Sequence, residues 1–329
     1  MKPLFTLDVE LHKVFLDLKT FRVIKKERLI NIQKAKRLST ILHISLILLF
    51  YLLFLFLYLQ NVISEILYLA FLLISLLILS LSIVVFRKAR RIKRKITISL
   101  AILLLLFCYE LPLIGFASQS HIADIYFDPR ETVERSGIFI ITIGTKTLNN
   151  MESKQAVQEL LTKEHKDVLT ISELTNPMSY KNKNRTLLSW FGQTSPKEKM
   201  REDLKEYFGK EEQRITDYFK DDQAIGNSAG LAILLTELMI NGAFQNHLPI
   251  AVTGAINGKG EVTAVGGIKE KIQIAEKSGF QFMFIPSENS KEAEIFQKEL
   301  NTNIRIFDVN HVDEAVEQIN YLNEKYKKK

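Results

Sequence analysis

Cysteine is almost absent from this chain. The 329 residues include one cysteine, Cys108, which lies within a long apolar stretch. Residues 118–329 contain no cysteine, so they hold neither a disulfide framework nor a cysteine-based metal site. No cofactor or metal ion is expected in this part of the chain.

The chain also lacks a phosphate-binding loop and a basic nucleic-acid-binding stripe. No Gly-x-x-x-x-Gly-Lys-Ser/Thr sequence occurs, which excludes an ATPase motor of the P-loop type from these residues. The net charge of +7 divides unevenly, with +11 in residues 1–117 and −4 in residues 118–329. The basic character belongs to the first part, where membrane orientation and anionic lipid explain it, and no nucleic-acid partner is expected.

A cleavable signal peptide is not recognisable, because residues 1–38 are polar or amphipathic. Three apolar stretches follow, at roughly residues 39–59, 63–86 and 96–117. Each reaches the ~20 residues that a transmembrane helix needs. Residues 39–117 are therefore predicted to form three transmembrane helices in the lipid bilayer.

Basic residues predict the orientation of this membrane anchor. The first 37 residues contain ten Lys or Arg and the loop 87–95 contains seven, whereas the link 60–62 contains none. The positive-inside rule places both basic segments, 1–38 and 87–95, in the cytoplasm. After three crossings, residues 118–329 are expected on the opposite side, outside the cytoplasmic membrane of a bacterium.

The segment 118–220 is predicted to be a linker with irregular α/β structure. Its patterns predict a strand at residues 138–143, a helix at 153–164 and a highly charged, solvated helix at 198–220. Residues 175–197 are polar and contain several helix breakers, which favours a surface loop.

A small-residue turn that contains Ser228 precedes an apolar run at residues 231–240, which is long enough for a buried helix. Ser228 is expected at the N-terminus of this helix, where backbone N–H groups and the helix dipole stabilise an oxyanion. Gly226 and Gly230 would let a substrate backbone approach closely. The alternative is that Ser228 is only an N-cap, a position that serine favours.

Lys271 follows Ser228 by 43 residues and lies on the apolar face of a predicted helix at residues 268–278. Its neighbours at helical spacing include Ile268 and Ala275. Apolar surroundings lower the pKa of a lysine, which is what a general base requires. The alternative is a lysine whose stem covers apolar surface while its ammonium group reaches water.

A hairpin is predicted between the serine and the lysine. Its strands lie at residues 249–256 and 261–265, around an Asn-Gly turn. The hairpin leads directly into the lysine helix, which makes Thr253 a candidate to hydrogen-bond the lysine amine. The alternative is that Thr253 is an ordinary strand residue.

Five segments over about residues 226–320 resemble the proteolytic domain of Lon-type serine proteases, in the order of that family. They are the small-residue serine turn, Ala251-Val252-Thr253-Gly254, the Gly-Gly-Ile-Lys-Glu-Lys start of the lysine helix, Phe282-Met283-Phe284-Ile285-Pro286 and Val312-Asp313-Glu314-Ala315. The resemblance implies an α+β fold, in which a Lon-type core of mixed strands and helices at residues 221–329 follows the three-helix transmembrane anchor.

The same resemblance implies a Ser-Lys dyad, with Ser228 as the nucleophile and Lys271, not Lys269, as the general base. It implies Thr253 as the supporting threonine, and a ring-shaped homo-oligomer. Membrane-anchored Lon-like proteases also carry a peptide-binding PDZ module before the protease, for which residues 118–220 are short and irregular.

Two residues depart from the family's pattern. Asn227 stands where a proline usually precedes the nucleophile, and Ile225 stands where an acidic residue is often found. Asp221 and Asp222 are candidates to replace that acid.

These observations predict an ATP-independent serine endopeptidase at the bacterial cell surface, acting on flexible peptides or exposed protein segments. One alternative is a catalytically silent binding or assembly module on the same fold and membrane anchor. Another is an α/β-hydrolase-type esterase with His311 as the base, which is disfavoured because a charged segment, not an apolar strand, precedes Ser228.

Overall fold

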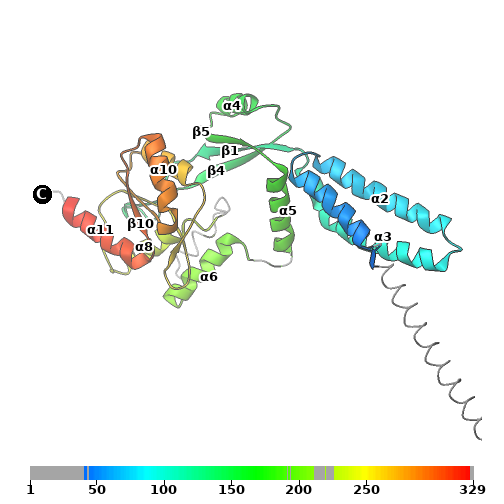
Figure 1. The fold of residues 1–329 in the computed structure, drawn as a ribbon. Helices are drawn as coiled ribbons and strands as arrows, with labels where there is room; N and C mark the ends of the chain where they lie inside the picture. The colour runs from blue at the N-terminus through cyan, green and yellow to red at the C-terminus, as the bar shows by residue number, and fades with distance from the viewer. Residues whose placement is uncertain are drawn as a thin grey trace, which may run out of the picture. The chain divides into compact units, whose positions relative to one another are not determined.

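The computed structural model describes residues 41–326 apart from 43, 191, 193, 211–218 and 220–225. The chain divides into two compact units (Figure 1). One comprises the residues up to Ala117 together with Asn176–Lys183, and the other comprises Ser118–Thr175 and Asn184–Lys329.

The first unit is built from apolar helices, Ile44–Leu59, α2 (Glu65–Val85) and α3 (Arg90–Glu110), and α3 continues into the 3-10 turn η1 (Leu111–Phe116). Glu65–Val85 and Arg90–Phe116 are each long and apolar enough to cross a membrane, and only 22% of the most apolar window of each is buried. Large apolar side chains on the surface of both helices suit a lipid environment.

Two of the three predicted spans therefore have helices of sufficient length within the described ranges. The first predicted span, 39–59, is represented by the shorter apolar helix Ile44–Leu59, and the residues before 41 lie outside the described part of the chain.

The interior of the helical unit holds a charged pair. Lys183 donates to Glu110 at 2.7 Å, and the side chains of both residues are fully buried. Tyr51 and Tyr180 donate to the other oxygen of the same carboxylate, at 2.6 Å and 3.1 Å. The Lys183 ammonium lies 3.9 Å from the ring centroids of Tyr109 and Tyr180, so both charges have close partners.

Lys183 belongs to α5 (Asn176–Trp190), so the surface loop predicted at residues 175–197 is wrong over most of its length. Pro177 does not prevent the helix, because it lies in the first turn, where proline needs no hydrogen-bond partner. The start of α5 is fixed by Asn176, which donates to the carbonyls of Tyr58 and Ile63 at 2.7 Å and 2.8 Å. These partners are more than 100 residues away in sequence, and local patterns do not show them.

The second unit contains a small antiparallel sheet of three strands in the order β4-β1-β5. Its elements are β1 (Gln119–Tyr126), β4 (Ile143–Asn149), α4 (Lys154–Lys163) and β5 (Val168–Glu173). Ala123 and Ile125 of β1 point to the face covered by α4, where they pack with Val157 and Leu161. The intervening β1 residues point to the opposite face, because side chains alternate along a strand.

The second unit also contains a five-stranded sheet in the order β10-β9-β6-β3-β2. The strands are β2 (Arg130–Glu131), β3 (Ile138–Ile140), β6 (Ile250–Val252), β9 (Phe282–Pro286) and β10 (Arg305–Val309). All neighbours are parallel except β2 and β3.

Helices cover both faces of this sheet. Alternate strand residues such as Val252 and Phe284 pack with α8 (Gly230–Ile240) and α11 (Val312–Tyr326). The residues between them, such as Ala251 and Met283, pack with α9 (Ile268–Lys277) and α10 (Ser290–Leu300). Continuous apolar strands are expected in such a sheet, because both of its faces are buried.

Several predicted elements are present. The helix expected at 153–164 is α4, and the Lys271 helix is α9. The strand predicted at 138–143 is divided, because β3 ends at Ile140 in the larger sheet and β4 begins at Ile143 in the smaller one.

The charged helix predicted at 198–220 corresponds to α6 (Pro196–Phe208). It ends at Gly209 in the left-handed conformation, and most of the remaining predicted residues lie outside the described ranges. Met200 and Leu204 of α6 belong to the core around α8. β2, β3 and α6 all belong to the second unit, together with the residues that follow 220. The structure therefore does not divide at residue 220, where the sequence predicts a boundary.

Candidate active site

Ser228 lies in a turn immediately before α8. The helix begins at Gly230, and its N-cap is Ala229, which makes no side-chain capping bond. The structure does not support the reading of Ser228 as an N-cap, because Ser228 precedes the cap. Its side chain is half-buried.

The serine turn is joined to the end of β6. The carbonyl of Ser228 accepts hydrogen bonds from the N–H of Gly254 at 2.8 Å and from the hydroxyl of Thr253 at 3.4 Å. The N–H of Leu231 in turn donates to the carbonyl of Gly254 at 3.0 Å. These contacts fix the position of the Ser228 backbone against the sheet.

Thr253 therefore supports the serine side of the site. The hydroxyl of this fully buried residue reaches the Ser228 carbonyl, and its N–H donates to Phe284 at 3.0 Å. The sequence predicts that Thr253 bonds the amine of Lys271, and no such bond is present among the described residues. The difference arises because β6 ends beside the serine turn, so the hydroxyl finds a backbone acceptor there.

The two glycines of the turn have different surroundings. A Cβ atom at Gly230 would lie 2.9 Å from Ile256 Cγ1 and 3.3 Å from the Ile256 nitrogen. Gly230 therefore lets α8 approach β7 (Ala255–Ile256), and its burial does not fit the predicted role in admitting a substrate backbone. Gly226 is exposed, and among the described residues only the nitrogen of Ser228, at 4.0 Å, lies within reach of a Cβ placed there.

Lys271 lies in the first turn of α9 and is only 4% exposed, as its position on the apolar helix face predicts. Burial lowers the pKa of its amine to about 8, against smaller opposing effects of Glu270 and Glu292. Lys269, two residues earlier, instead forms an ion pair with Glu299 and is partly exposed. Of these two lysines, Lys271 has the environment that a neutral amine requires.

The order of the elements brings the serine turn and Lys271 to the same end of the sheet. β6 and β9 are parallel, and the Ser228 turn is bonded to the residues that follow β6. α9 runs back to the start of β9, so its first turn lies toward the carboxyl ends of these strands. Crevices at the carboxyl ends of parallel strands are the usual ligand sites of such sheets.

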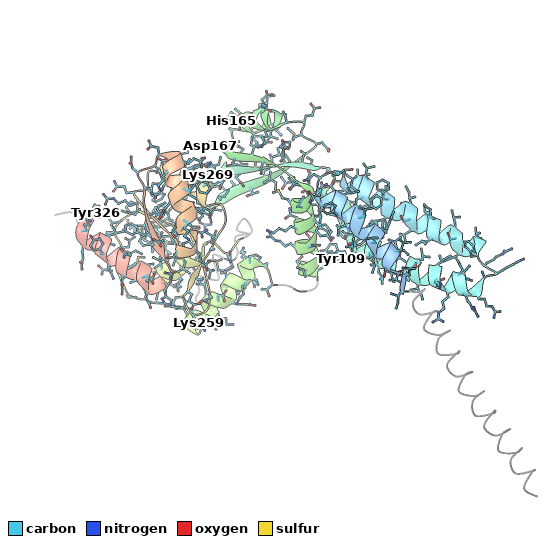
Figure 2. All side chains as sticks on the ribbon, in the orientation of Figure 1. Tyr109, His165, Asp167, Lys259, Lys269 and Tyr326 are labelled. Carbon is cyan, nitrogen blue, oxygen red and sulfur yellow. The ribbon has the colours of Figure 1, made fainter. Side chains whose placement is uncertain are left out.

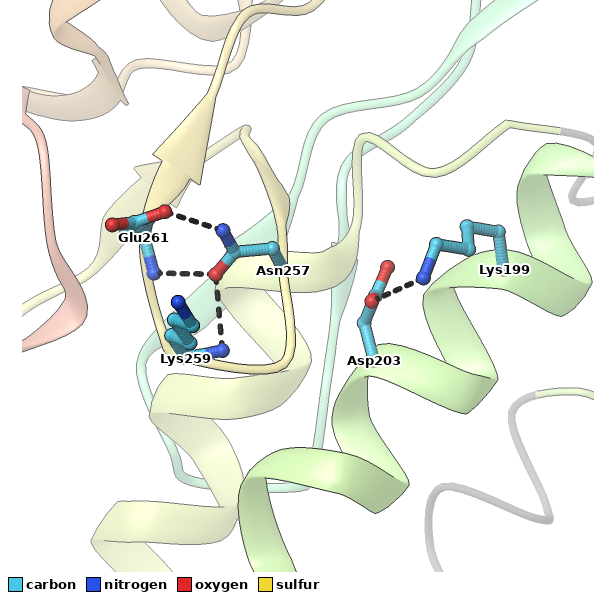
Figure 3. Close-up of polar contacts among 5 residues, drawn as sticks. All are labelled: Lys199, Asp203, Asn257, Lys259 and Glu261. Atoms are coloured by element: carbon cyan, nitrogen blue, oxygen red, sulfur yellow. Dashed lines mark hydrogen bonds and ion pairs between the residues drawn. The ribbon is translucent and has the colours of Figure 1, made fainter.

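The hairpin predicted between the serine and the lysine is present around its turn only, because the first predicted strand divides into β6 of the five-stranded sheet and β7 of the hairpin. β7 pairs with β8 (Val262–Thr263), and Asn257 closes the turn, because its side-chain oxygen accepts from the N–H of Lys259 at 3.0 Å and of Glu261 at 3.1 Å (Figure 3). Asn257 also donates to the Glu261 carboxylate at 2.5 Å. This rigid turn fixes the direction in which the chain enters α9.

Asn289 also supports the path of the chain from the hairpin into α9. This residue does not stand out in the sequence. The side chain of this buried residue accepts from the N–H of Val265 at 2.9 Å and donates to its carbonyl at 3.1 Å. Asn289 thereby fixes the backbone of Val265 between β8 and α9. The available signal was an asparagine directly before α10, a position that normally suggests helix capping.

Both ring nitrogens of His311 bond to backbone groups, which fits a structural role for this residue. Its Nε2 lies 2.9 Å from the carbonyl of Lys259, and its Nδ1 accepts from the N–H of Asp313 at 3.2 Å. Both ring nitrogens are thus engaged at the start of α11, which argues against the esterase alternative. Across the described ranges, no group of three or more His, Cys, Asp or Glu side chains forms a candidate metal site.

Three other residues considered from the sequence, Asp221, Asp222 and Ile225, lie outside the described part of the chain. Asn227 is described, and its carbonyl accepts from the N–H of Gly230 at 3.1 Å.

Comparison with known proteins identifies the region around this site. Residues 201–321 match the family model of the Lon protease (S16) C-terminal proteolytic domain. The chain is 32% identical over 91 residues to the Lon protease of Rickettsia typhi and 33% identical over 91 residues to that of Neorickettsia sennetsu. It is 31% identical over 96 residues to the Lon protease of Aster yellows witches'-broom phytoplasma.

These similarities cover 28% or 29% of this chain and only 11% or 12% of the length of each relative. The family model's match, residues 201–321, contains α8, the β7–β8 hairpin and α9. Residues 201–321 are therefore similar to the C-terminal proteolytic domain of Lon proteases, and the chain spans about one eighth of the length of these relatives.

Proposed function

We propose that this protein is a membrane-anchored serine endopeptidase that uses Ser228 as its nucleophile and Lys271 as its general base. The observation that carries the proposal is the buried amine of Lys271, whose pKa is lowered to about 8, in a domain similar to the Lon proteolytic domain. A neutral amine accepts the proton of a serine hydroxyl at a pH where an ordinary lysine is protonated.

In the proposed reaction, Ser228 Oγ attacks the carbonyl carbon of the scissile peptide bond while Lys271 Nζ takes the hydroxyl proton. Lys271 then returns the proton to the leaving amine, and water hydrolyses the acyl-enzyme. Backbone N–H groups of the serine turn are candidates to stabilise the oxyanion. Those of Gly230 and Leu231 already donate to carbonyls, whereas those of Ser228 and Ala229 have no acceptor among the described residues.

We further propose that cleavage needs no ATP and acts on flexible peptides or exposed protein segments. The 329 residues contain no phosphate loop that would drive unfolding of a substrate. The apolar helices and the basic residues of the first 95 positions support a membrane anchor with a cytoplasmic N-terminus and an extracytoplasmic catalytic domain. A homo-oligomeric ring remains part of this proposal.

The test uses the full chain in detergent and an unstructured casein substrate without nucleotide. We expect turnover by the parent protein, loss of turnover in Ser228→Ala and Lys271→Ala, and retained turnover in Lys269→Ala, the matched control on the same helix. Circular dichroism verifies that each variant is folded. Equal turnover in all variants would refute the dyad, and a folded parent without activity on a broad peptide library would favour the silent binding module.

Reporter fusions test the orientation. A periplasmic-type phosphatase joined after residue 329 should be active, and the same reporter joined before residue 1 should be inactive. The reverse pattern would contradict an extracytoplasmic catalytic domain.

A further inference from the structure

The Lys271 helix lies between two sheets. One side of α9 packs on the five-stranded sheet, and the other contacts the three-stranded sheet on the face opposite to α4. Tyr126 of β1 lies 3.0 Å from Ser278 at the end of the helix, and Asp167, just before β5, pairs with Lys277. Figure 2 labels Asp167 and, on α9, Lys269.

A row of polar side chains crosses the three-stranded sheet and ends beside Lys271. Asp124 of β1 stands opposite Thr145 of β4 and Thr170 of β5. Thr145 donates to Asp124 at 3.0 Å, and Thr170 donates to the carboxylate of Glu270 at 2.9 Å. Burial raises the pKa of Asp124 against the effect of the Thr145 bond, and the charge of Glu270 adds to the rise.

Glu270 is the neighbour of Lys271 in the first turn of α9. Two carboxylates act on the lysine amine, Glu270 from its own helix and Glu292 from α10. The negative charge of Glu270 favours the ammonium form and partly offsets the effect of burial. The hydroxyl of Thr170, in the three-stranded sheet, fixes the position of the Glu270 carboxylate. That position therefore affects whether the amine of Lys271 is protonated.

We propose that the three-stranded sheet positions the general base, with Thr170 holding the Glu270 carboxylate next to Lys271. This inference rests on the proposed function, in which Lys271 is the base. Thr170 and Glu270 are positioning residues, because they act through Lys271. Thr170 lies outside residues 201–321, the segment shared with the Lon family model, so this support comes from the chain's own upstream segment.

The experiment measures the lysine itself. The full chain in detergent is acetylated briefly with trace acetic anhydride at a series of pH values, and mass spectrometry of peptides gives the acetylation of each lysine against pH. Glu270→Gln removes the charge and keeps a partner for Thr170. Thr170→Val removes the hydrogen bond and keeps the charge, and Thr170→Ser retains both.

Tyr126→Phe is the matched control, because it removes a contact between the same sheet and the far end of the same helix. The parent protein should give a midpoint for Lys271 near pH 8. We expect a lower midpoint in Glu270→Gln and in Thr170→Val, and the parent midpoint in Thr170→Ser and Tyr126→Phe. In casein turnover at pH 7, Thr170→Val should raise kcat with little change in KM, because a lower Lys271 midpoint leaves more of the amine neutral, and Thr170→Ser should give the parent kcat.

An unchanged Lys271 midpoint in Glu270→Gln would overturn the inference. If the Lys271 midpoint and the kcat of Thr170→Val equalled those of the parent, the inference would also be overturned, because the three-stranded sheet would then not affect the Lys271 amine. The acetylation measurement needs no turnover, so these outcomes are distinct from failure of the proposed function, which would appear as full activity in Lys271→Ala.

Discussion

Lys271 is an amine placed where water hardly reaches it. Its helix presents it to the core beside Ile268 and Ile272, and burial lowers its pKa from the ordinary value of 10.5 to about 8. A protein gains little stability from such a residue, because the charged form loses hydration. The same loss of hydration makes the neutral amine available near physiological pH.

Proteolysis should therefore depend on pH through Lys271. If the neutral amine is the base, kcat/KM should rise with pH, with a midpoint of about 8, and become constant above it. Initial rates with a short fluorogenic peptide at low concentration, from about pH 6 to pH 10, check this expectation. A profile that falls over this range would contradict a lysine base.

The burial that makes Lys271 available as a neutral base also lowers the stability of the folded protein. The folded pKa of Lys271 lies below the unfolded one, so the folded state binds fewer protons between them, and stability rises with pH from about 8 toward 10.5. At pH 7 most of the destabilisation caused by burial of the Lys271 amine is present. We expect Lys271→Met to raise the free energy of unfolding at that pH by up to about 3 kcal/mol.

Calorimetric unfolding of the full chain in detergent at pH 7 and pH 10 measures this difference, which should fall to about 1 kcal/mol at the higher pH. Lys269→Met is the control, because Lys269 is partly exposed and paired with Glu299, and it should give no gain. A gain that is equal at both pH values would contradict titration of Lys271 as the cause.

Between elements, the contact of α8 with β7 fixes the serine turn. We predict that Gly230→Ala destabilises the protein by about 1–3 kcal/mol, because the added methyl group overlaps Ile256 and pushes α8 from the hairpin. Gly226→Ala, in open space two residues before Ser228, should change stability by less than about 0.5 kcal/mol. Thermal unfolding of both variants provides the comparison, and equal effects would contradict the packing role of Gly230.

The joining of α5 to the helical unit depends on a buried ion pair. Removal of one charge, as in Lys183→Met or Glu110→Gln, leaves the other buried with fewer partners and should cost about 3–5 kcal/mol. The double variant should be less destabilised than the sum of the two single variants. Unfolding in detergent measures the cycle, and strict additivity would show that the two charges do not interact.

Elements that depend on local pattern could be predicted from the sequence. The apolar face of residues 268–278 and the Asn-Gly turn gave α9 and the β7–β8 hairpin, and the burial of Lys271 followed from the first of these. The helix α5 could not be predicted, because its stabilising partner Glu110 is 73 residues away. The hydroxyl of Thr253 was assigned the wrong partner, because the backbone geometry at the end of β6 is not visible in residue types.

For the whole molecule, the segment shared with the Lon family is smaller than the domain that has to fold. Residues 201–321 contain β6, β9 and β10, whereas β2 and β3 of the same sheet come from residues 130–140. Ile138 and Ile140 belong to the core around α8. The upstream segment is thus part of the five-stranded sheet as well as a connection to the helical unit.

We predict that a fragment of residues 201–329 fails to fold, because the edge of β6 that pairs with β3 and part of the core would be exposed. A fragment of residues 118–329 retains both sheets and should give a cooperative thermal transition. Circular dichroism during heating tests both fragments. A cooperative transition in the shorter one would show that β2 and β3 are dispensable.

The division of the chain has a consequence for release of the protein from a membrane. The polypeptide passes between the two units three times, after Ala117, after Thr175 and after Lys183. A single cut after Ala117 would leave residues 118–329 attached, because Asn176–Lys183 remains bonded to the helical unit through Asn176 and the buried Lys183. Release of the second unit by a protease would therefore require further cuts on both sides of that segment, or its extraction together with the buried charge of Lys183.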